Sequence, residues 1–259
     1  MNFLKKISTV VSIASFLFIT TSSTVSANEL EELQEKGVMR IAMEGTYPPF
    51  NYVDDKNEVV GFDPAIGREL AKRLGMEVEI VTTTWSGILA GLLSNKYDAI
   101  VGSMTITEKK EKVVDFVGPY YNVRRAIYVR SDSNIKGLKD LKDKRVGATL
   151  GETHEKWSKA HDSWKVQTYQ SLTQLLMDLK IGRIDAIVND NIPVLALIEK
   201  NGIKVKELDI PNLAALPAGI AIRKGNEKLK EAMQKALESM QKDGTVEKIA
   251  KKWVGLDIR

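Results

Sequence analysis

Short apolar runs alternate with amphipathic runs along most of the chain. Residues 38–43, 78–81 and 99–101 are short and apolar, which is typical of buried strands. Residues 64–74 and 88–93, which lie between these runs, repeat apolar side chains at helical spacing. The second half of the chain shows the same alternation. The pattern predicts an α/β fold with mostly parallel sheet.

Local signals mark where several of the expected helices begin. Asp63 followed by Pro64 looks like an N-cap and a proline in the first helical position, so we expect Asp63 to cap its helix. Ser171, with Gln174 three residues later, has the spacing of a capping box. The sequence also predicts two closing amphipathic helices, over 226–243 and 245–253.

The tetrapeptide Asp-Ala-Ile-Val occurs twice, at 98–101 and at 185–188. Each copy follows an apolar helical run and a short basic link, and small and polar residues follow each copy. In open α/β sheets, ligands bind at the carboxyl ends of the strands. The repeat therefore predicts two similar lobes with polar groups at that edge. The extended segments 118–130 and 216–224 are candidates for two crossings between the lobes.

The first 27 residues have the features of an export signal. Two early lysines precede an apolar run at 10–19 that is too short to span a membrane, and 25–27 is a small-x-small cleavage site. We expect the mature chain to begin at Asn28; a membrane anchor is the alternative. The chain has no cysteine, which excludes disulfides, thiolate chemistry and a lipid-modified cysteine. We therefore expect a protein that is free in the periplasm, with secretion as the alternative.

Charged side chains change the prediction little. Acids and bases mix on helical faces such as 136–144, which is typical of solvated surface, and the formal net charge is +4. We find no stripe of basic and aromatic residues that would indicate nucleic-acid binding. His154 and His161 lie on one expected helix, where we expect them on the surface. We predict no metal and no cofactor.

One segment looks built to hold a small ligand. An apolar strand ends at Glu44, and Pro48 and Pro49 stiffen a turn that holds Tyr47 and Phe50 beside this acid. A carboxylate next to a fixed aromatic ring is a suitable seat for a polar or cationic group. The alternative is an ordinary turn with packed aromatic rings.

Nine segments, taken in order, resemble the polar amino acid-binding proteins of ABC importers, over nearly the whole expected mature chain. They are 44–50, 60–63, 97–100, 104–107, 114–116, 119–121, 182–186, 189–190 and 243–249. The resemblance implies a two-lobed periplasmic binding protein fold of type II. Each lobe would hold a mostly parallel sheet flanked by helices, and a two-stranded hinge would join the lobes. The expected division is a signal peptide at 1–27, a first lobe at 28–121, a second lobe at 122–222 and a return to the first lobe at 223–259.

The resemblance also implies roles for residues of the first lobe. Tyr47 and Trp85 resemble the aromatic walls that enclose the ligand side chain. Ser103 and Thr105 resemble the groups that meet the amine and carboxylate of the ligand. Glu44 resembles the acid near the side-chain end of the ligand. For Trp85, a place in the core is the alternative.

Two residues of the second lobe complete the implied site. Thr153 resembles the group whose backbone N–H caps the ligand carboxylate, and Asp190 resembles the acid that takes the α-ammonium. A zwitterion needs partners at both of its ends, and these partners are divided between the lobes. Both charged ends of the ligand therefore have partners only when the lobes close. The alternative for Asp190 is a surface turn.

The chain departs from the family pattern at one position. Lys110 stands where the family places an arginine that binds the α-carboxylate with two parallel hydrogen bonds. A lysine is a point charge without that planar fork. Either Lys110 holds the carboxylate, or Arg124 or Arg125 helps, or the ligand is not an ordinary α-amino acid.

The predicted function is a receptor that passes an amino acid to a membrane permease, and we expect a monomer that is not an enzyme. Glu44 favours arginine, lysine, ornithine or histidine, with glutamine or cystine second. The similar cyclohexadienyl dehydratases are one alternative, but their glutamate three residues after the aspartate is replaced by Pro193. A sensor or interaction module is the other alternative.

Overall fold

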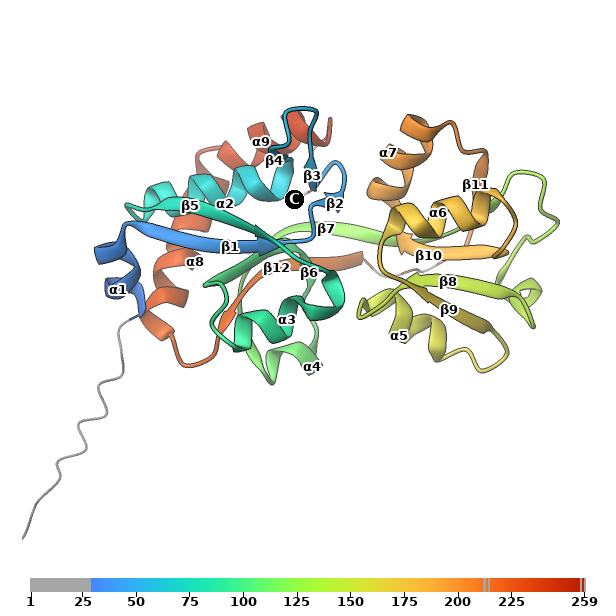
Figure 1. Cartoon of the computed structure of the whole chain (residues 1–259), viewed down its shortest axis with the longest axis horizontal. Coiled ribbons are helices and arrows are strands. Elements are labelled where there is room, and N and C mark those ends of the chain that lie inside the picture. Colours follow the sequence, from blue (N-terminus) through green and yellow to red (C-terminus); the bar gives the residue numbers. More distant parts are fainter. Residues whose placement is uncertain (1–28, 212, 214, 257, 259) are drawn as a thin grey trace, which may run out of the picture.

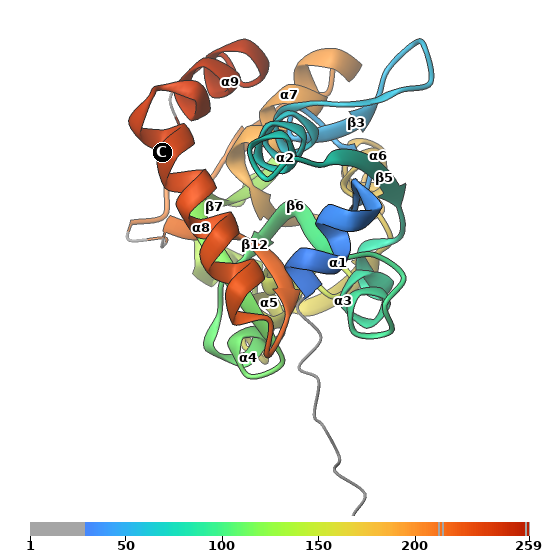
Figure 2. The same cartoon turned by 90° about the vertical axis from the view of Figure 1, so that its left-hand side faces the viewer.

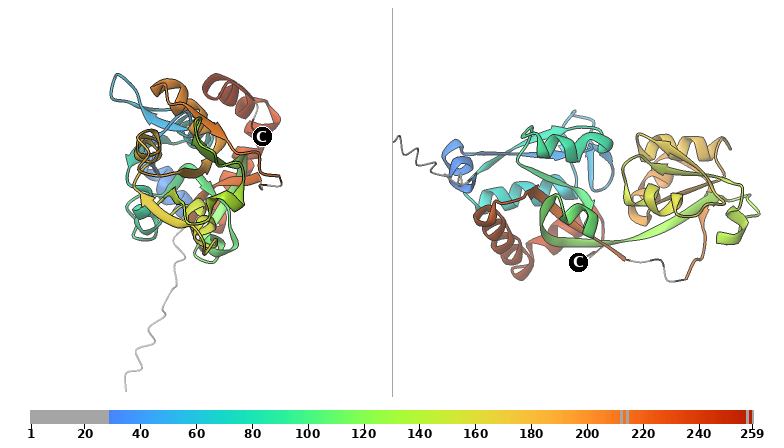
Figure 3. Two further views of the ribbon diagram at one scale, coloured as in Figure 1. Left: turned by 90° about the vertical axis from the view of Figure 1, so that its right-hand side faces the viewer. Right: turned by 90° about the horizontal axis from the view of Figure 1, so that it is seen from below.

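The computed structural model describes residues 29–211, 213, 215–256 and 258. The expected signal peptide and its cleavage site lie outside these residues. Two lobes lie side by side, and the long strand β7 (Val114–Arg130) runs from one into the other (Figure 1; Figure 3, right). Strand β12 (Ala215–Arg223) pairs antiparallel with β7. The predicted lobe boundaries after 121 and 222 fall within β7 and near the end of β12.

Among the described residues, one sheet runs through both lobes in the order β5-β1-β6-β12-β7-β10-β8-β9, and β11 also pairs with β7. In the first lobe, β12 is preceded in this order by β5 (Glu77–Thr82), β1 (Val38–Met43) and β6 (Ala99–Thr105). The second lobe holds β10 (Ala186–Asp190), β8 (Arg145–Thr149), β9 (Lys165–Tyr169) and β11 (Val205–Glu207). The strands β5, β1 and β6 are parallel, as are β10, β8 and β9, which confirms the predicted mostly parallel sheets. A small antiparallel sheet in the first lobe comprises β2 (Thr46–Tyr47), β3 (Asn51–Val53) and β4 (Val59–Val60).

Helices cover the sheet of each lobe. The first lobe carries α1 (Glu29–Lys36), α2 (Phe62–Arg73), α3 (Trp85–Leu93), α4 (Glu108–Glu111), α8 (Glu227–Lys242) and α9 (Thr245–Trp253). The second lobe carries α5 (Thr153–Lys159), α6 (Leu172–Lys180), α7 (Asn191–Asn201) and the 3-10 helix η1 (Leu138–Leu141). The two closing helices are confirmed, and the Ser171 hydroxyl accepts from the Gln174 backbone N–H at the start of α6, as predicted.

Alternate residues of β6 point to opposite sides of the first-lobe sheet. Val101 packs in one core cluster with Ile66 of α2, whereas Ile100 packs in another with Ile88 of α3. The two helices therefore cover opposite faces of the sheet (Figure 2). This arrangement leaves the carboxyl end of β6 free of covering helices and directed toward the second lobe.

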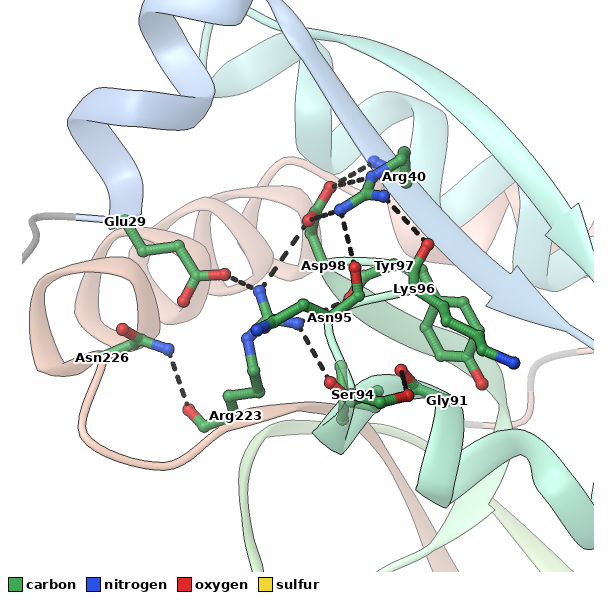
Figure 4. Close-up of polar contacts among 11 residues, drawn as sticks. Glu29, Arg40, Gly91, Ser94, Asn95, Lys96, Tyr97, Asp98, Arg223 and Asn226 are labelled. Carbon is green, nitrogen blue, oxygen red and sulfur yellow. Dashed lines mark hydrogen bonds and ion pairs between the residues drawn. The ribbon is translucent and has the colours of Figure 1, made fainter.

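The repeated tetrapeptide has the same structural role in both lobes. Arg40 on β1 donates to Asp98 with an Nη2–Oδ1 distance of 2.7 Å, and Arg145 on β8 donates to Asp185 over the same distance. The backbone N–H of each arginine also donates to the same aspartate. Figure 4 shows the first-lobe copy, in which Arg223 also forms an ion pair with Asp98. The prediction of two similar lobes is thereby confirmed.

The predicted helix cap at Asp63 is wrong. Helix α2 begins at Phe62, two residues before the expected start at Pro64, and its N-cap is Gly61, whose φ of 127° is in a region that glycine adopts readily. Asp63 is instead buried and accepts hydrogen bonds from Tyr120 Oη at 2.6 Å, Asn51 Nδ2 at 2.6 Å and Ser103 Oγ at 2.9 Å. The Asp-Pro pattern matches a cap, but three donors from distant parts of the chain fix this carboxylate in the core.

Candidate functional site

A small cavity lies where the two lobes meet. All eight residues that the sequence predicted as ligand contacts line it: Glu44, Tyr47, Trp85, Ser103, Thr105, Lys110, Thr153 and Asp190. Four further residues complete the lining, and the sequence reasoning assigned none of them to the site: Asn51, Gly102, Glu152 and His154. Trp85 therefore lies at the cavity, is half-buried, and also packs against the core cluster that contains Ile88 and Ile100.

The buried Asp63 shapes the first-lobe wall of the cavity. It accepts from the Ser103 hydroxyl, and Ser103 has a positive φ of 64°, which is uncommon outside glycine. It also accepts from the Asn51 amide, whose oxygen in turn accepts from Gly45 N at 2.8 Å. Gly45 follows Glu44 directly, so the same network fixes the loop that carries this acid. Burial raises the pKa of Glu44.

Asp190 is the central acid of the second lobe. Its side chain is buried at the end of β10, which excludes the surface-turn alternative. Asp190 Oδ2 accepts from Tyr47 Oη at 2.8 Å, across the lobe interface. Tyr47 Oη also lies 2.9 Å from the amide oxygen of Asn189. The tyrosine hydroxyl is therefore a contact between lobes, a role that the expected aromatic wall did not include.

The expected surface position is wrong for His154. His154 is buried, and its Nε2 lies 3.0 Å from Asp190 Oδ1. Because Arg125 Nε donates to His154 Nδ1 at 3.3 Å, the ring proton lies on Nε2 and is donated to Asp190. His161 is half-buried and stacks on Trp164 with a centroid distance of 4.1 Å. The position of His154 next to Thr153 was the sequence signal for its place in the site.

Lys110 and Glu152 bring opposite charges to the cavity from opposite lobes. Lys110 Nζ donates to the carbonyl oxygen of Thr105 at 2.9 Å, and burial lowers the pKa of Lys110 to about 8. Burial raises the pKa of Glu152 well above its ordinary value, and the nearby charge of Asp190 raises it further. Arg124, in contrast, does not line the cavity and pairs with Glu207 on β11 at 2.5 Å.

The lobes are closed on each other in this structure. Thr105 Oγ1 and Thr153 Oγ1 lie 3.4 Å apart across the interface. At the rim, Ser86 Oγ donates to Gln170 Oε1 over 3.4 Å. Together with the hydrogen bond from Tyr47 to Asp190, these contacts enclose the cavity between polar groups of both lobes.

Comparison with known proteins agrees with this arrangement. The family model for bacterial extracellular solute-binding proteins, family 3, matches residues 39–256. The chain is 33% identical over 252 residues to the L-cystine-binding protein TcyJ of Escherichia coli (strain K12), which covers 96% of this chain and 94% of that protein. A solved structure of an ancestral arginine-binding protein bound to arginine has a TM-score of 0.80 and 42% identity, over 84% of this chain and 98% of that one. The ancestral amino acid-binding protein AncCDT-1, a precursor of cyclohexadienyl dehydratase, has a TM-score of 0.81 and 35% identity, over 87% and 99% of the two chains. This chain, with its two lobes closed on a polar cavity, belongs to the bacterial extracellular solute-binding proteins, family 3.

Proposed function

We propose that the protein is the extracytoplasmic receptor of an ABC importer and delivers a polar, basic amino acid to the permease. The observation that carries this proposal is the division of the cavity lining. A buried carboxylate, Asp190, is supplied by one lobe, and a half-buried ammonium, Lys110, is supplied by the other. A zwitterionic amino acid matches this pair of charges when the lobes are closed.

The lining assigns each end of the ligand a partner. The α-ammonium would bind Asp190, whose carboxylate is already oriented by hydrogen bonds to Tyr47 and His154. The α-carboxylate would bind Lys110 and the hydroxyl groups of Ser103 and Thr105 at the end of β6, with the backbone N–H of Thr153 on the opposite side. The side chain would then extend past Trp85 toward Glu44.

Two observations favour a basic side chain. Glu44 places a half-buried carboxylate at the side-chain end of the cavity. In addition, one similar solved protein is an ancestral arginine-binding protein. Arginine, lysine, ornithine and histidine are therefore our first choices, and glutamine and cystine follow.

The cavity favours binding over catalysis. Both ring nitrogens of His154 are engaged within the protein, by Arg125 and by Asp190, so this ring is poorly placed to exchange protons with a ligand. At the position where a dehydratase would carry its glutamate, Pro193 is buried in α7. We propose that the ligand is released chemically unchanged.

The proposed setting is the periplasm, with a single copy of the chain presenting its closed lobes to the permease. None of the described helices has both the length and the apolar character that a membrane span needs. In the closed form the two lobe surfaces have one fixed spacing, which is how the permease would recognise a loaded receptor.

A thermal-shift screen of all natural amino acids tests the proposal. A tight ligand stabilises the protein by RT ln(1 + [L]/Kd), so a basic amino acid should give the largest shift. Small-angle scattering with and without that ligand should then show a smaller radius of gyration at saturation. The absence of a shift with every amino acid would refute the receptor function, and an unchanged radius in a protein known to be open would refute closure as the signal.

A further inference from the structure

We infer that Glu152 selects for an amino acid with a cationic side chain, because closure brings it together with Glu44 to form a seat for a second positive charge. This inference rests on the proposed receptor function and adds to it a specificity-determining residue of the second lobe. Glu44 comes from the first lobe and Glu152 from the second, and both line the same cavity. The seat is therefore complete only when the lobes close.

The Glu152 carboxylate is oriented by the residues around Asp190. Asn189 Nδ2 donates to Glu152 Oε2 at 3.2 Å. The amide oxygen of Asn189 accepts from the Asp190 backbone N–H at 2.9 Å and lies 2.9 Å from Tyr47 Oη. Because the Asp190 backbone N–H donates to the amide oxygen, the NH₂ group must face Glu152. One asparagine thus holds both acids of the second lobe in a defined arrangement.

Glu152 has no evident role in the stability of its own helix. It immediately precedes α5 and occupies the N-cap position, but its side chain makes no capping hydrogen bond. Its carboxylate lines the cavity instead. A half-buried acid that does not cap its helix and faces a cavity between the lobes is suited to bind a cation from elsewhere.

The charges around the cavity do not balance without such a cation. Three carboxylates line it, from Glu44, Glu152 and Asp190, and Lys110 provides the cation of the lining. Arg125 adds a second positive charge behind His154. Burial, followed by the neighbouring charges of Asp190 and Glu44, raises the pKa of Glu152, and a cation in the cavity would favour its ionised form.

The excess of carboxylates around the cavity indicates the net charge of the ligand that fits it. A neutral zwitterion such as glutamine brings one charge of each sign and leaves the excess of carboxylates unchanged. Arginine or lysine brings one more positive charge, which cancels the excess left by the lining and Arg125. Discrimination then arises from the cost of closing on unpaired carboxylates and not only from contacts with the correct ligand.

Calorimetry with arginine and citrulline tests this inference, because citrulline has nearly the shape of arginine without its side-chain charge. The unmodified protein should prefer arginine by about tenfold or more. Glu152→Gln should weaken arginine binding by about tenfold to hundredfold and leave citrulline binding unchanged or improved. Glu152→Asp, which keeps the charge, should keep most of the preference for arginine.

Asp162→Asn is the matched control. It removes one negative charge from the same lobe, but Asp162 is exposed and does not line the cavity. It should leave the ratio of the two affinities unchanged. Equal losses for arginine and citrulline in Glu152→Gln, or no loss for either, would overturn the inference. Tight binding of glutamine in preference to arginine would overturn it while leaving the receptor function intact, whereas failure to bind any amino acid would refute both.

Discussion

The hydroxyl of Tyr47 offers a direct test of how closure is coupled to binding. It donates to Asp190 Oδ2 over 2.8 Å and joins the first lobe to the acid that we propose for the α-ammonium. Both side chains are buried, with exposed fractions of 6% for Tyr47 and 4% for Asp190. Tyr47→Phe removes one oxygen and keeps the ring that stacks on Phe50.

The expected size of the effect follows from the charge of the acceptor. A hydrogen bond to a charged group contributes about 1.5–3 kcal/mol, and this one forms only when the lobes are together. Its loss should shift the closure equilibrium toward the open form by about tenfold to hundredfold. Because apparent affinity scales with the population of the competent state, the Kd of Tyr47→Phe should rise by the same factor where the open form predominates.

Two measurements on each variant separate closure from folding. Calorimetry gives the Kd, and fluorescence transfer between dyes on cysteines introduced at Asp55 and Lys200 reports the distance between lobes. Both positions are exposed, and the chain has no native cysteine. Tyr169→Phe is the matched control, because the Tyr169 hydroxyl donates to Asp178 within the second lobe at 2.9 Å. It should lower the melting temperature without changing the closed fraction.

The reasoning would be refuted if Tyr47→Phe bound ligand within about threefold of the unmodified protein and closed to the same extent. Equal losses of affinity in Tyr47→Phe and Tyr169→Phe would also contradict it, since they would indicate a general loss of stability. The predicted signature is a large loss of affinity and of the closed population in Tyr47→Phe alone.

Three further predictions concern charged groups. Lys110→Met should weaken binding severely while Lys110→Arg preserves or improves it; calorimetry that finds both unchanged would place the carboxylate partner elsewhere. Asp190→Ala should abolish binding, because a buried ligand charge would lose its partner, while circular dichroism shows a folded protein; binding within about threefold would exclude this role. Burial raises the pKa of Asp63 from 3.8 to about 6, so the stability that protonation of Asp63 contributes is lost as the pH rises through about 6. In urea titrations Asp63→Asn should therefore gain about 2 kcal/mol relative to the unmodified protein between pH 4 and pH 7, and a difference independent of pH would contradict the burial of a charged Asp63.

The order of strands and helices was predictable because it depends on local patterns. The closing helices follow from apolar spacing within 226–243 and 245–253, and α8 and α9 lie within one residue of these bounds. The repeated tetrapeptide could be interpreted because its two aspartates occupy equivalent positions in two similar sheets. Such signals need no knowledge of distant parts of the chain.

The buried polar groups were not predictable in the same way. The donors to Asp63 come from 12, 40 and 57 residues away, so no local pattern separates this acid from a helix cap. His154 is 36 residues from Asp190 and 29 from Arg125, and its spacing to His161 indicates only a shared helix. Glu152 was missed because the family resemblance drew attention to the backbone N–H of Thr153 and not to the side chain before it.

Lys110 and Glu152 are the two unusual features of the cavity, and both affect how a ligand carboxylate would be bound. Lys110, in place of the arginine that the family resemblance led us to expect, offers a single ammonium to the α-carboxylate, and part of its hydrogen bonding is already used by Thr105. Glu152 adds an acid on the opposite wall, close enough to Lys110 to attract the same ammonium. On the proposed function, both features should weaken the hold on the carboxylate end of a ligand, and Glu152 should strengthen the hold on a cationic end. Affinity should then depend on the positive groups of the ligand, so we expect the charge of the cavity to set its selectivity.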